Sequence, residues 1–142
     1  MNALAGHRTG LARTTVSEWM TPGVIDCGSD TSLSEVAEIM ATRRVHCVVV
    51  TGFGRREAPL WGIVSDLDLV AAACVRALDD QTAGGSAATP ALVVRPDETL
   101  ERAAQLMTEH AVTHLVVVDA GRPVGVLSTL DVARACTSRA GS

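Results

Sequence analysis

The sequence predicts a mixed α/β (α+β) fold, in which a β-α-β-β-α unit occurs twice and the two units pack sheet to sheet with pseudo-twofold symmetry. Two observations support this prediction. The same motifs recur in the same order in both halves of the chain, and the apolar spacing changes between helical and strand-like patterns within each half. One copy of about 60 residues buries too little surface to be dependably stable alone, so the copies are expected to pack around a central cleft.

An internal repeat organises the whole chain. The amphipathic segment and the apolar run after it recur 67 residues later, as Leu33 and Leu100 show, and the Gly-x-x-Ser-x-x-Asp motifs start 63 residues apart, at Gly62 and Gly125. The difference reflects a longer loop, 51–61, in the first copy. The matching motifs are Thr21-Pro22 and Thr89-Pro90, Val24-Ile25 and Leu92-Val93, Asp30 and Asp97, the runs 45–50 and 112–118, and the signatures ending at Asp68 and Asp131.

Each copy predicts an amphipathic helix. Apolar residues fall at i, i+3, i+4 and i+7 in the segments 33–40 and 100–107. Ser32 with Glu35 forms the pattern of a capping box before the first of these helices, and Thr99 is expected to cap the second.

Short β-branched runs predict the strands. The runs 45–50 and 112–118 are almost uninterrupted, as is typical of buried strands. Shorter apolar segments at 60–64 and 124–127 lead into a second helix that begins near Ser65 or Ser128. The predicted organisation is a flexible N-terminus over 1–15, a first repeat over 16–78, a linker over 79–88, a second repeat over 89–137 and a C-terminal tail over 138–142.

Composition excludes several classes of function. The 142 residues include twelve Arg and no Lys, with a formal net charge of −4 and 2% aromatic residues. Lysine Schiff-base chemistry, a basic nucleic-acid surface and an aromatic stacking platform are therefore not expected. No apolar stretch is long enough for a membrane span, so we expect a soluble, cytoplasmic protein that binds neither nucleic acid nor membrane. The four cysteines form no Cys-x-x-Cys pair and are interpreted as small apolar residues, with no metal site.

Each copy resembles a cystathionine-β-synthase (CBS) domain, and residues 16–137 together resemble a tandem CBS pair, or Bateman module. The resemblance rests on the lead-in Val16-Ser17-Glu18-Trp19-Met20-Thr21, the two strand-helix units and both Gly-x-x-Ser-x-x-Asp signatures. It implies that the chain forms a homodimer. It also implies that AMP, ADP, ATP or S-adenosylmethionine binds as a regulatory ligand in the cleft between the repeats.

The signature residues suit such a ligand chemically. An aspartate carboxylate accepts hydrogen bonds from ribose hydroxyls, the preceding serine lies at a helix N-terminus that suits a phosphate oxygen, and nearby apolar side chains can enclose an adenine ring. The alternative is a purely structural capping box. The second-repeat site is expected to comprise Leu92, Val93, Val112, Thr113, His114, Ser128, Thr129 and Asp131, and the first-repeat site Val24, Ile25, Val45, His46, Ser65 and Asp68.

The two sites are not expected to be equivalent. Asp66 adds a carboxylate beside Asp68 that repels phosphate, whereas Thr129 occupies the matching place in the second copy. The second-repeat site is therefore the preferred nucleotide site. Further candidate phosphate partners are Arg43, Arg44 and Arg122.

Two functions remain open from the sequence. The first is a stand-alone regulatory module that senses an adenosine-type ligand and signals in trans to a separately encoded effector. The alternative is a dimeric protein-interaction module that binds no nucleotide. This chain departs from ligand-binding members of the family, with Val49 or Val116 in place of a proline and Leu67 or Leu130 in place of a basic residue. These departures allow the alternative. An enzyme is not expected, because the spacing indicates no nucleophile and base pair and no glycine-rich phosphate loop.

Overall fold

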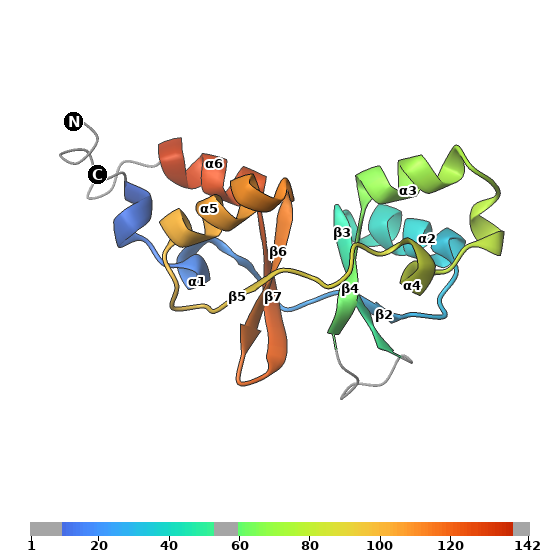
Figure 1. Cartoon of the computed structure of the whole chain (residues 1–142), viewed down its shortest axis with the longest axis horizontal. Helices are drawn as coiled ribbons and strands as arrows, with labels where there is room; N and C mark the ends of the chain where they lie inside the picture. The colour runs from blue at the N-terminus through green and yellow to red at the C-terminus, as the bar shows by residue number, and fades with distance from the viewer. Residues whose placement is uncertain (1–9, 53–59, 138–142) are drawn as a thin grey trace. The chain divides into compact units, whose positions relative to one another are not determined.

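The computed structural model describes residues 10–52 and 60–137. The chain forms two compact units. The first unit comprises Val24–Leu92, and the second unit joins the N-terminal residues up to Gly23 to the residues from Val93 onward. In each unit the helices lie on one side of a small β-sheet (Figure 1). The α+β fold class and the twofold occurrence of the β-α-β-β-α order are confirmed.

The first unit contains a three-stranded sheet of order β2-β3-β4. Its strands are β2 (Asp26–Gly28), β3 (Cys47–Thr51) and β4 (Leu60–Ser65). β2 runs parallel to β3, and β3 runs antiparallel to β4. The helices α2 (Leu33–Arg43) and α3 (Asp66–Ala73) follow β2 and β4, and the short helices η4 (Leu78–Asp80) and α4 (Ala83–Ser86) come after α3.

The second unit contains a four-stranded sheet of order β1-β7-β6-β5. Its strands are β1 (Thr21–Pro22), β5 (Val93–Val94), β6 (His114–Asp119) and β7 (Arg122–Ser128). β5 is parallel to β6, whereas β7 is antiparallel to both β6 and β1. The helices are η2 (Gly10–Arg13), α1 (Val16–Trp19), α5 (Leu100–His110) and α6 (Thr129–Thr137).

The predicted elements are present with shifts at their ends. α2 and α5 continue beyond their last periodic apolar residues. The residues that cap their C-termini, Arg44 and Ala111, have left-handed φ angles of 55° and 52°. β2 begins at Asp26, directly after the repeated motif Val24-Ile25. Before β2, Ile25 contributes its carbonyl oxygen, which accepts a hydrogen bond from Val49 N at 2.9 Å.

The predicted helix caps are formed by hydroxyl groups. Ser32 Oγ accepts from Glu35 N at 3.2 Å, and Thr99 Oγ1 accepts from Arg102 N at 3.1 Å. The first of these bonds is one half of the predicted capping box. Each satisfies a backbone donor that the helix itself leaves unpaired.

The periodic apolar positions of both repeats form the cores. In the first unit a cluster of buried side chains joins α2 to β3, β4 and the segment after α3. The matching positions of α5, β6 and β7 are buried in the second unit. The buried residues that fix this arrangement are Leu33, Val36, Met40, Val48, Val50, Val64 and Ala83 in the first unit, and Leu100, Ala103, Met107, Leu115, Val117 and Leu127 in the second.

The lead-in segment of each repeat lies along the sheet of the other repeat. Thr21-Pro22 forms β1, which pairs with β7. Ala88, just before Thr89-Pro90, forms an antiparallel bridge with Ile63 in β4. The compact units therefore divide the chain differently from the predicted repeats, because residues 16–23 belong to the second unit and residues 79–92 to the first.

The segment 79–88, expected as a linker, is folded against the first unit. Ala83 is fully buried in the core. Gln81 Nε2 donates to the carbonyl oxygens of Ala72 and Arg76 at 2.9 and 3.0 Å. Trp61 Nε1 donates to Gly84 O at 3.0 Å. Small residues pack closely here, as the approach of Gly84 to Ser29 shows. Residues 1–9, 53–59 and 138–142, which include most of the expected tails and the tip of the long loop, lie outside the described residues.

Candidate functional site

The predicted residues of the first-repeat site converge at one end of the sheet of the first unit. Ser65 at the end of β4 lies opposite Cys47 at the start of β3. Asp66 N donates to His46 O at 2.9 Å, which fixes the start of α3 against the residue before β3. Because β2 is parallel to β3, Val24 and Ile25, which precede β2, reach the same end. Val45 precedes His46 in the turn after α2.

The second unit repeats this arrangement. His114 at the start of β6 lies opposite Ser128 at the end of β7, and Thr129 N donates to Thr113 O at 2.9 Å. Val93 starts the parallel strand β5 and is 48% exposed. The remaining members of the predicted set are Val112, in the turn before β6, Leu92, which ends the first unit, and Asp131 in the first turn of α6.

Both Ser-x-x-Asp motifs form reciprocal caps. Ser65 N donates to Asp68 Oδ2 at 2.8 Å while Asp68 N donates to Ser65 Oγ at 3.2 Å. Ser128 N donates to Asp131 Oδ2 at 2.8 Å while Asp131 N donates to Ser128 Oγ at 3.1 Å. The capping role considered from the sequence is therefore present in both copies.

One carboxylate oxygen of each motif takes no part in the cap. The caps use Oδ2 of Asp68 and of Asp131, and within residues 10–52 and 60–137 no hydrogen bond reaches either Oδ1. No fully buried side-chain oxygen in this part of the chain lacks a partner, so neither Oδ1 is fully buried. Asp131 as a whole is buried, with 9% of its surface exposed. Each motif thus holds a carboxylate with one oxygen that accepts no hydrogen bond from the described residues.

The donors beside the two carboxylates differ. In α3 the Leu67 N–H donates to Asp66 Oδ1 at 2.9 Å, and the Ser65 hydroxyl donates to Asp68 Oδ2 at 2.9 Å. At the start of α6, neither the Leu130 N–H nor the Ser128 hydroxyl hydrogen has an acceptor among the described residues. The second copy therefore presents two open donors where the first has none. The sequence places Asp66 beside the motif. It does not predict that the Asp66 carboxylate accepts a hydrogen bond from the Leu67 N–H, because this bond depends on the side-chain rotamer.

The histidines make different contacts in the two copies. His46 Nδ1 lies 3.1 Å from Asp66 Oδ2, with the two side chains 75% and 59% exposed. In the second copy, His114 Nδ1 lies 2.9 Å from Thr113 Oγ1. Solvent weakens the interaction between these two exposed side chains.

The apolar residues predicted around the base are partly accessible. Val24, Ile25, Val45, Leu92 and Val112 are half-buried. Val49 and Val116, which stand where a proline was expected, are 1% and 0% exposed. Both side chains are buried in this structure.

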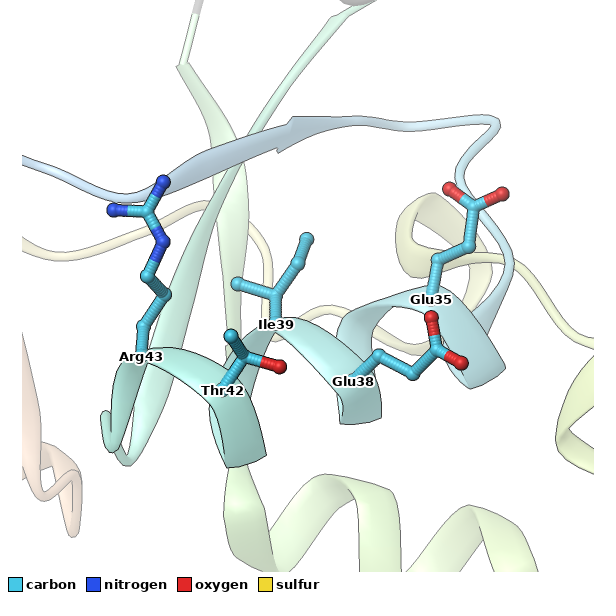
Figure 2. A pocket seen from close by; sticks show the side chains of 5 residues that line it. All are labelled: Glu35, Glu38, Ile39, Thr42 and Arg43. Atoms are coloured by element: carbon cyan, nitrogen blue, oxygen red, sulfur yellow. The ribbon is translucent and has the colours of Figure 1, made fainter.

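The arginines proposed as phosphate partners lie in different places. Arg43 lines an open hollow of about 410 Å³ on α2, where Figure 2 shows Arg43 and Glu35 at opposite ends with Ile39 between them. Arg122 begins β7, at the opposite end of that strand from Ser128. Because a strand rises about 3.3 Å per residue, Arg122 lies far from Ser128 along β7.

Two of the cysteines behave as apolar core groups. Burial raises the pKa of the Cys47 thiol to about 11, and burial, partly opposed by a hydrogen bond with Thr31, raises the pKa of Cys27 to about 11. Cys74 and Cys136 are exposed. Within residues 10–52 and 60–137 no three His, Cys, Asp or Glu side chains are grouped as metal ligands.

Among the helices that the structure describes, none has both the length and the apolar character that crossing a membrane requires.

Sequence comparison identifies the repeated unit. The profile of the CBS domain matches residues 16–74 and again residues 87–138. The chain is a tandem pair of CBS domains. This CBS pair is similar to the CBS domain-containing protein YhcV of Bacillus subtilis, with 28% identity over 119 residues that cover 83% of this chain and 82% of YhcV.

Solved CBS structures have the same fold. CBSX2, determined in complex with AMP, is 30% identical to this CBS pair, with a TM-score of 0.69 over 86% of this chain and 95% of CBSX2. The CBS domain pair of MJ0100, in complex with 5′-methylthioadenosine and S-adenosylmethionine, is 21% identical with a TM-score of 0.75 over 85% of this chain and 94% of that one. Adenosine-type ligands are thus bound by CBS pairs of similar extent.

Proposed function

We propose that this CBS pair is a homodimeric regulatory module that binds AMP, ADP, ATP or S-adenosylmethionine and signals in trans to a separate effector protein. The observation that carries the proposal is the open Oδ1 of Asp131, next to the unused donors of Ser128 and Leu130. The complexes of CBSX2 with AMP and of MJ0100 with S-adenosylmethionine support the ligand class.

The ribose contact uses one oxygen of the aspartate. Because Oδ2 of Asp131 holds the helix cap, the two ribose hydroxyls donate to the two lone pairs of Oδ1. The cap fixes the carboxylate before the ligand arrives, so little side-chain entropy is lost on binding. Val93 and Val112, both accessible in part, provide apolar surface for the adenine.

The phosphate contact distinguishes the two copies. In the second copy the Leu130 N–H and the Ser128 hydroxyl donate to a phosphate oxygen at the N-terminus of α6. In the first copy the Asp66 carboxylate already accepts the matching N–H and adds negative charge. The second-repeat site therefore takes the phosphate-bearing ligand, and the first-repeat site takes a ligand without phosphate.

A thermal-shift panel tests the ligand class. AMP, ADP, ATP, S-adenosylmethionine and NADH are each added to the purified chain at increasing concentration. A ligand present at 100 times its Kd stabilises the folded state by about 2.7 kcal/mol and raises the melting temperature accordingly. If no ligand of the panel raises it, the chain is instead a protein-interaction module that binds no nucleotide.

A reciprocal exchange tests the assignment of the phosphate site. Thr129→Asp brings a carboxylate to the open N–H, and AMP affinity measured by calorimetry should fall about tenfold or more. Asp66→Thr should leave binding at the second-repeat site unchanged and add phosphate affinity in the first unit. Two equal AMP sites in the unmodified chain would contradict the assignment.

A further inference from the structure

The hollow on α2 joins an apolar centre to charged ends. It has a volume of about 410 Å³ and is lined by Glu35, Glu38, Ile39, Thr42 and Arg43; we call it the α2 hollow. Ile39 packs against the core cluster with part of its surface accessible, and the four other residues are exposed. Two carboxylates therefore lie towards the N-terminal end of the hollow and a guanidinium lies at the C-terminal end, with the isoleucine between them (Figure 2).

The α2 hollow lies on the flank of α2 that faces away from α3. The Ser34 hydroxyl donates to Asp79 Oδ1, in the segment after α3, so this segment lies on the Ser34 flank. A helix turns about 100° per residue, which places Ile39 about 140° round the helix from Ser34. Figure 2 shows Glu35, Ile39 and Arg43 pointing to one side of α2, with α3 beyond the other side. The hollow is thus separate from the surface that α2 shares with α3.

The charged groups of the α2 hollow make no ion pair with any residue in the ranges 10–52 and 60–137. More carboxylates lie near its acidic end. The pKa of the Cys27 thiol is raised to about 11 mainly by burial and, to a smaller extent, by the carboxylates of Asp26, Asp30 and Glu35. The acidic end of the hollow is therefore part of a wider negative surface on the first unit.

This negative charge is specific to the first unit. Residues 24–92 contain nine acidic and five basic residues, whereas the rest of the chain contains seven of each. By the 67-residue offset of the repeats, α5 carries Arg102 where α2 has Glu35, and Gln105 where α2 has Glu38. The acidic end of the hollow is therefore not a requirement of the repeated fold. A negative field of this kind attracts basic partners.

We propose that the α2 hollow is the docking site for an amphipathic helical segment of a separate effector protein. Apolar side chains of this segment cover Ile39, basic side chains face Glu35 and Glu38, and an acidic side chain faces Arg43. The inference rests on the proposed signalling in trans, for which it names the contact surface and the chemistry of the partner. It does not depend on which ligand is bound.

The lining of the hollow fits a helix that runs antiparallel to α2. Its residues follow at i, i+3, i+4, i+7 and i+8, so the hollow extends along about two turns, or about 12 Å, of one helix face. A helix that lies in such a groove presents its own apolar residues at the same spacing. An antiparallel partner places its first turn near Arg43 and its last turn near Glu35. Acidic residues in that first turn and basic residues in that last turn also suit the partner's own dipole.

Fluorescence anisotropy with a labelled peptide tests the inference. The probe is a peptide of about 15 residues, the length at which isolated helices begin to form, with Glu in its first turn, Leu in its middle turns and Arg in its last turn. Glu38→Arg should raise the Kd of the peptide about tenfold or more, because like charges then meet. Glu109→Arg, at an exposed position of α5, changes the net charge equally and should leave the Kd unchanged. No binding to the unmodified chain, or an equal loss in both variants, would overturn the proposal.

Disulfide trapping tests where the peptide lies. A Cys74→Ser, Cys136→Ser background lacks the two exposed thiols. In this background Thr42→Cys should form a disulfide, on mild oxidation, with a cysteine placed beside the Leu residues of the peptide. Glu109→Cys, at the matching position of α5, is the control and should form much less of the product. Equal trapping in both variants would contradict the α2 hollow as the docking site.

AMP calorimetry separates this inference from the proposed function. Glu38 lies outside the proposed ligand sites, so Glu38→Arg should bind AMP as the unmodified chain does. Peptide binding to a chain that binds no AMP would support the docking site and contradict the proposed ligand. AMP binding by a chain that does not bind the peptide would overturn the docking site and support the proposed ligand.

Discussion

Asp68 and Asp131 each cap a helix with one of their two carboxylate oxygens. Oδ2 holds the cap of the following helix, and Oδ1 remains open. The capping and ligand-binding interpretations of the Ser-x-x-Asp motif are therefore compatible, because each uses a different oxygen. Removal of either aspartate removes a helix cap together with the open oxygen, so a cap elsewhere in the same unit is needed to separate the loss of stability from the loss of affinity.

The serine of the second motif can be compared with a cap of the same unit. Ser128→Ala removes the acceptor for Asp131 N, and Thr99→Ala removes the acceptor for Arg102 N. Each should lower the free energy of unfolding by about 0.5–2 kcal/mol in urea titrations. Only Ser128→Ala should also weaken AMP binding, because only Ser128 faces the proposed ligand. An equal loss of AMP affinity in Thr99→Ala would count against a direct role for Ser128.

The four thiols should divide into two classes. At pH 8 a thiol of pKa about 11, as for Cys27 and Cys47, is about 0.1% thiolate. Ellman's reagent should therefore modify Cys74 and Cys136, which are exposed, quickly and the other two slowly. The slow rates should rise about tenfold per pH unit below the raised pKa, because thiolate is the reactive form. Rapid modification of all four thiols in the native state would contradict the burial.

At the residue scale, the sequence predicts which side chains gather but not which donors stay open. The motif spacing located Ser65, Asp68 and their second-repeat counterparts correctly at helix starts. The hydrogen bond from the Leu67 N–H to Asp66 Oδ1 depends on the rotamer of the Asp66 side chain, which residue identity does not determine.

At the element scale, the lead-in segments show the limit of pattern reasoning. Thr21-Pro22 and Thr89-Pro90 are the same motif before equivalent strands, so the local pattern fits either sheet edge. The structure pairs Thr21-Pro22 with β7 and the residue before Thr89 with β4. The helices and the central strands, in contrast, follow from local periodicity, and their core residues are those that the periodicity marks.

Gly62 and Gly125 of the signature motifs allow the chain segments before Thr89 and around Thr21 to approach β4 and β7 closely. A Cβ on Gly125 would lie 2.7 Å from Thr21 O, and a Cβ on Gly62 would overlap the carbonyl oxygen of Ala88. Gly125→Ala should therefore destabilise the second unit by about 1–3 kcal/mol, as for other overpacked sites. Gly10→Ala is the control, because nothing lies within 4 Å of the added carbon. Equal free energies of unfolding for the two variants would show that β1 does not approach β7 this closely.

At the scale of the whole molecule, neither predicted repeat contains a complete unit. A fragment ending at residue 78 lacks Ala83 and Gln81, which are buried in the first unit, and a fragment starting at residue 89 lacks Val16 and β1 of the second. The sequence predicted that the copies depend on each other for burial, but the structure adds that they exchange chain segments.

The absence of lysine has a consequence for the whole chain. Twelve arginines carry all the fixed positive charge at a net charge of −4, and the open donors at the preferred site are a backbone N–H and a hydroxyl. We therefore propose that the N-terminus of α6, rather than a cationic side chain, would recognise a phosphate.

Calorimetric titration of AMP into three chains tests the account most directly: the unmodified chain, Asp131→Ala and Asp68→Ala. We expect one AMP site per chain in the unmodified protein. Asp131→Ala should reduce the AMP affinity about tenfold or more, through the lost hydrogen bonds to a charged acceptor, and Asp68→Ala should leave it unchanged. Unaltered AMP affinity in Asp131→Ala, or a loss confined to Asp68→Ala, would contradict the account.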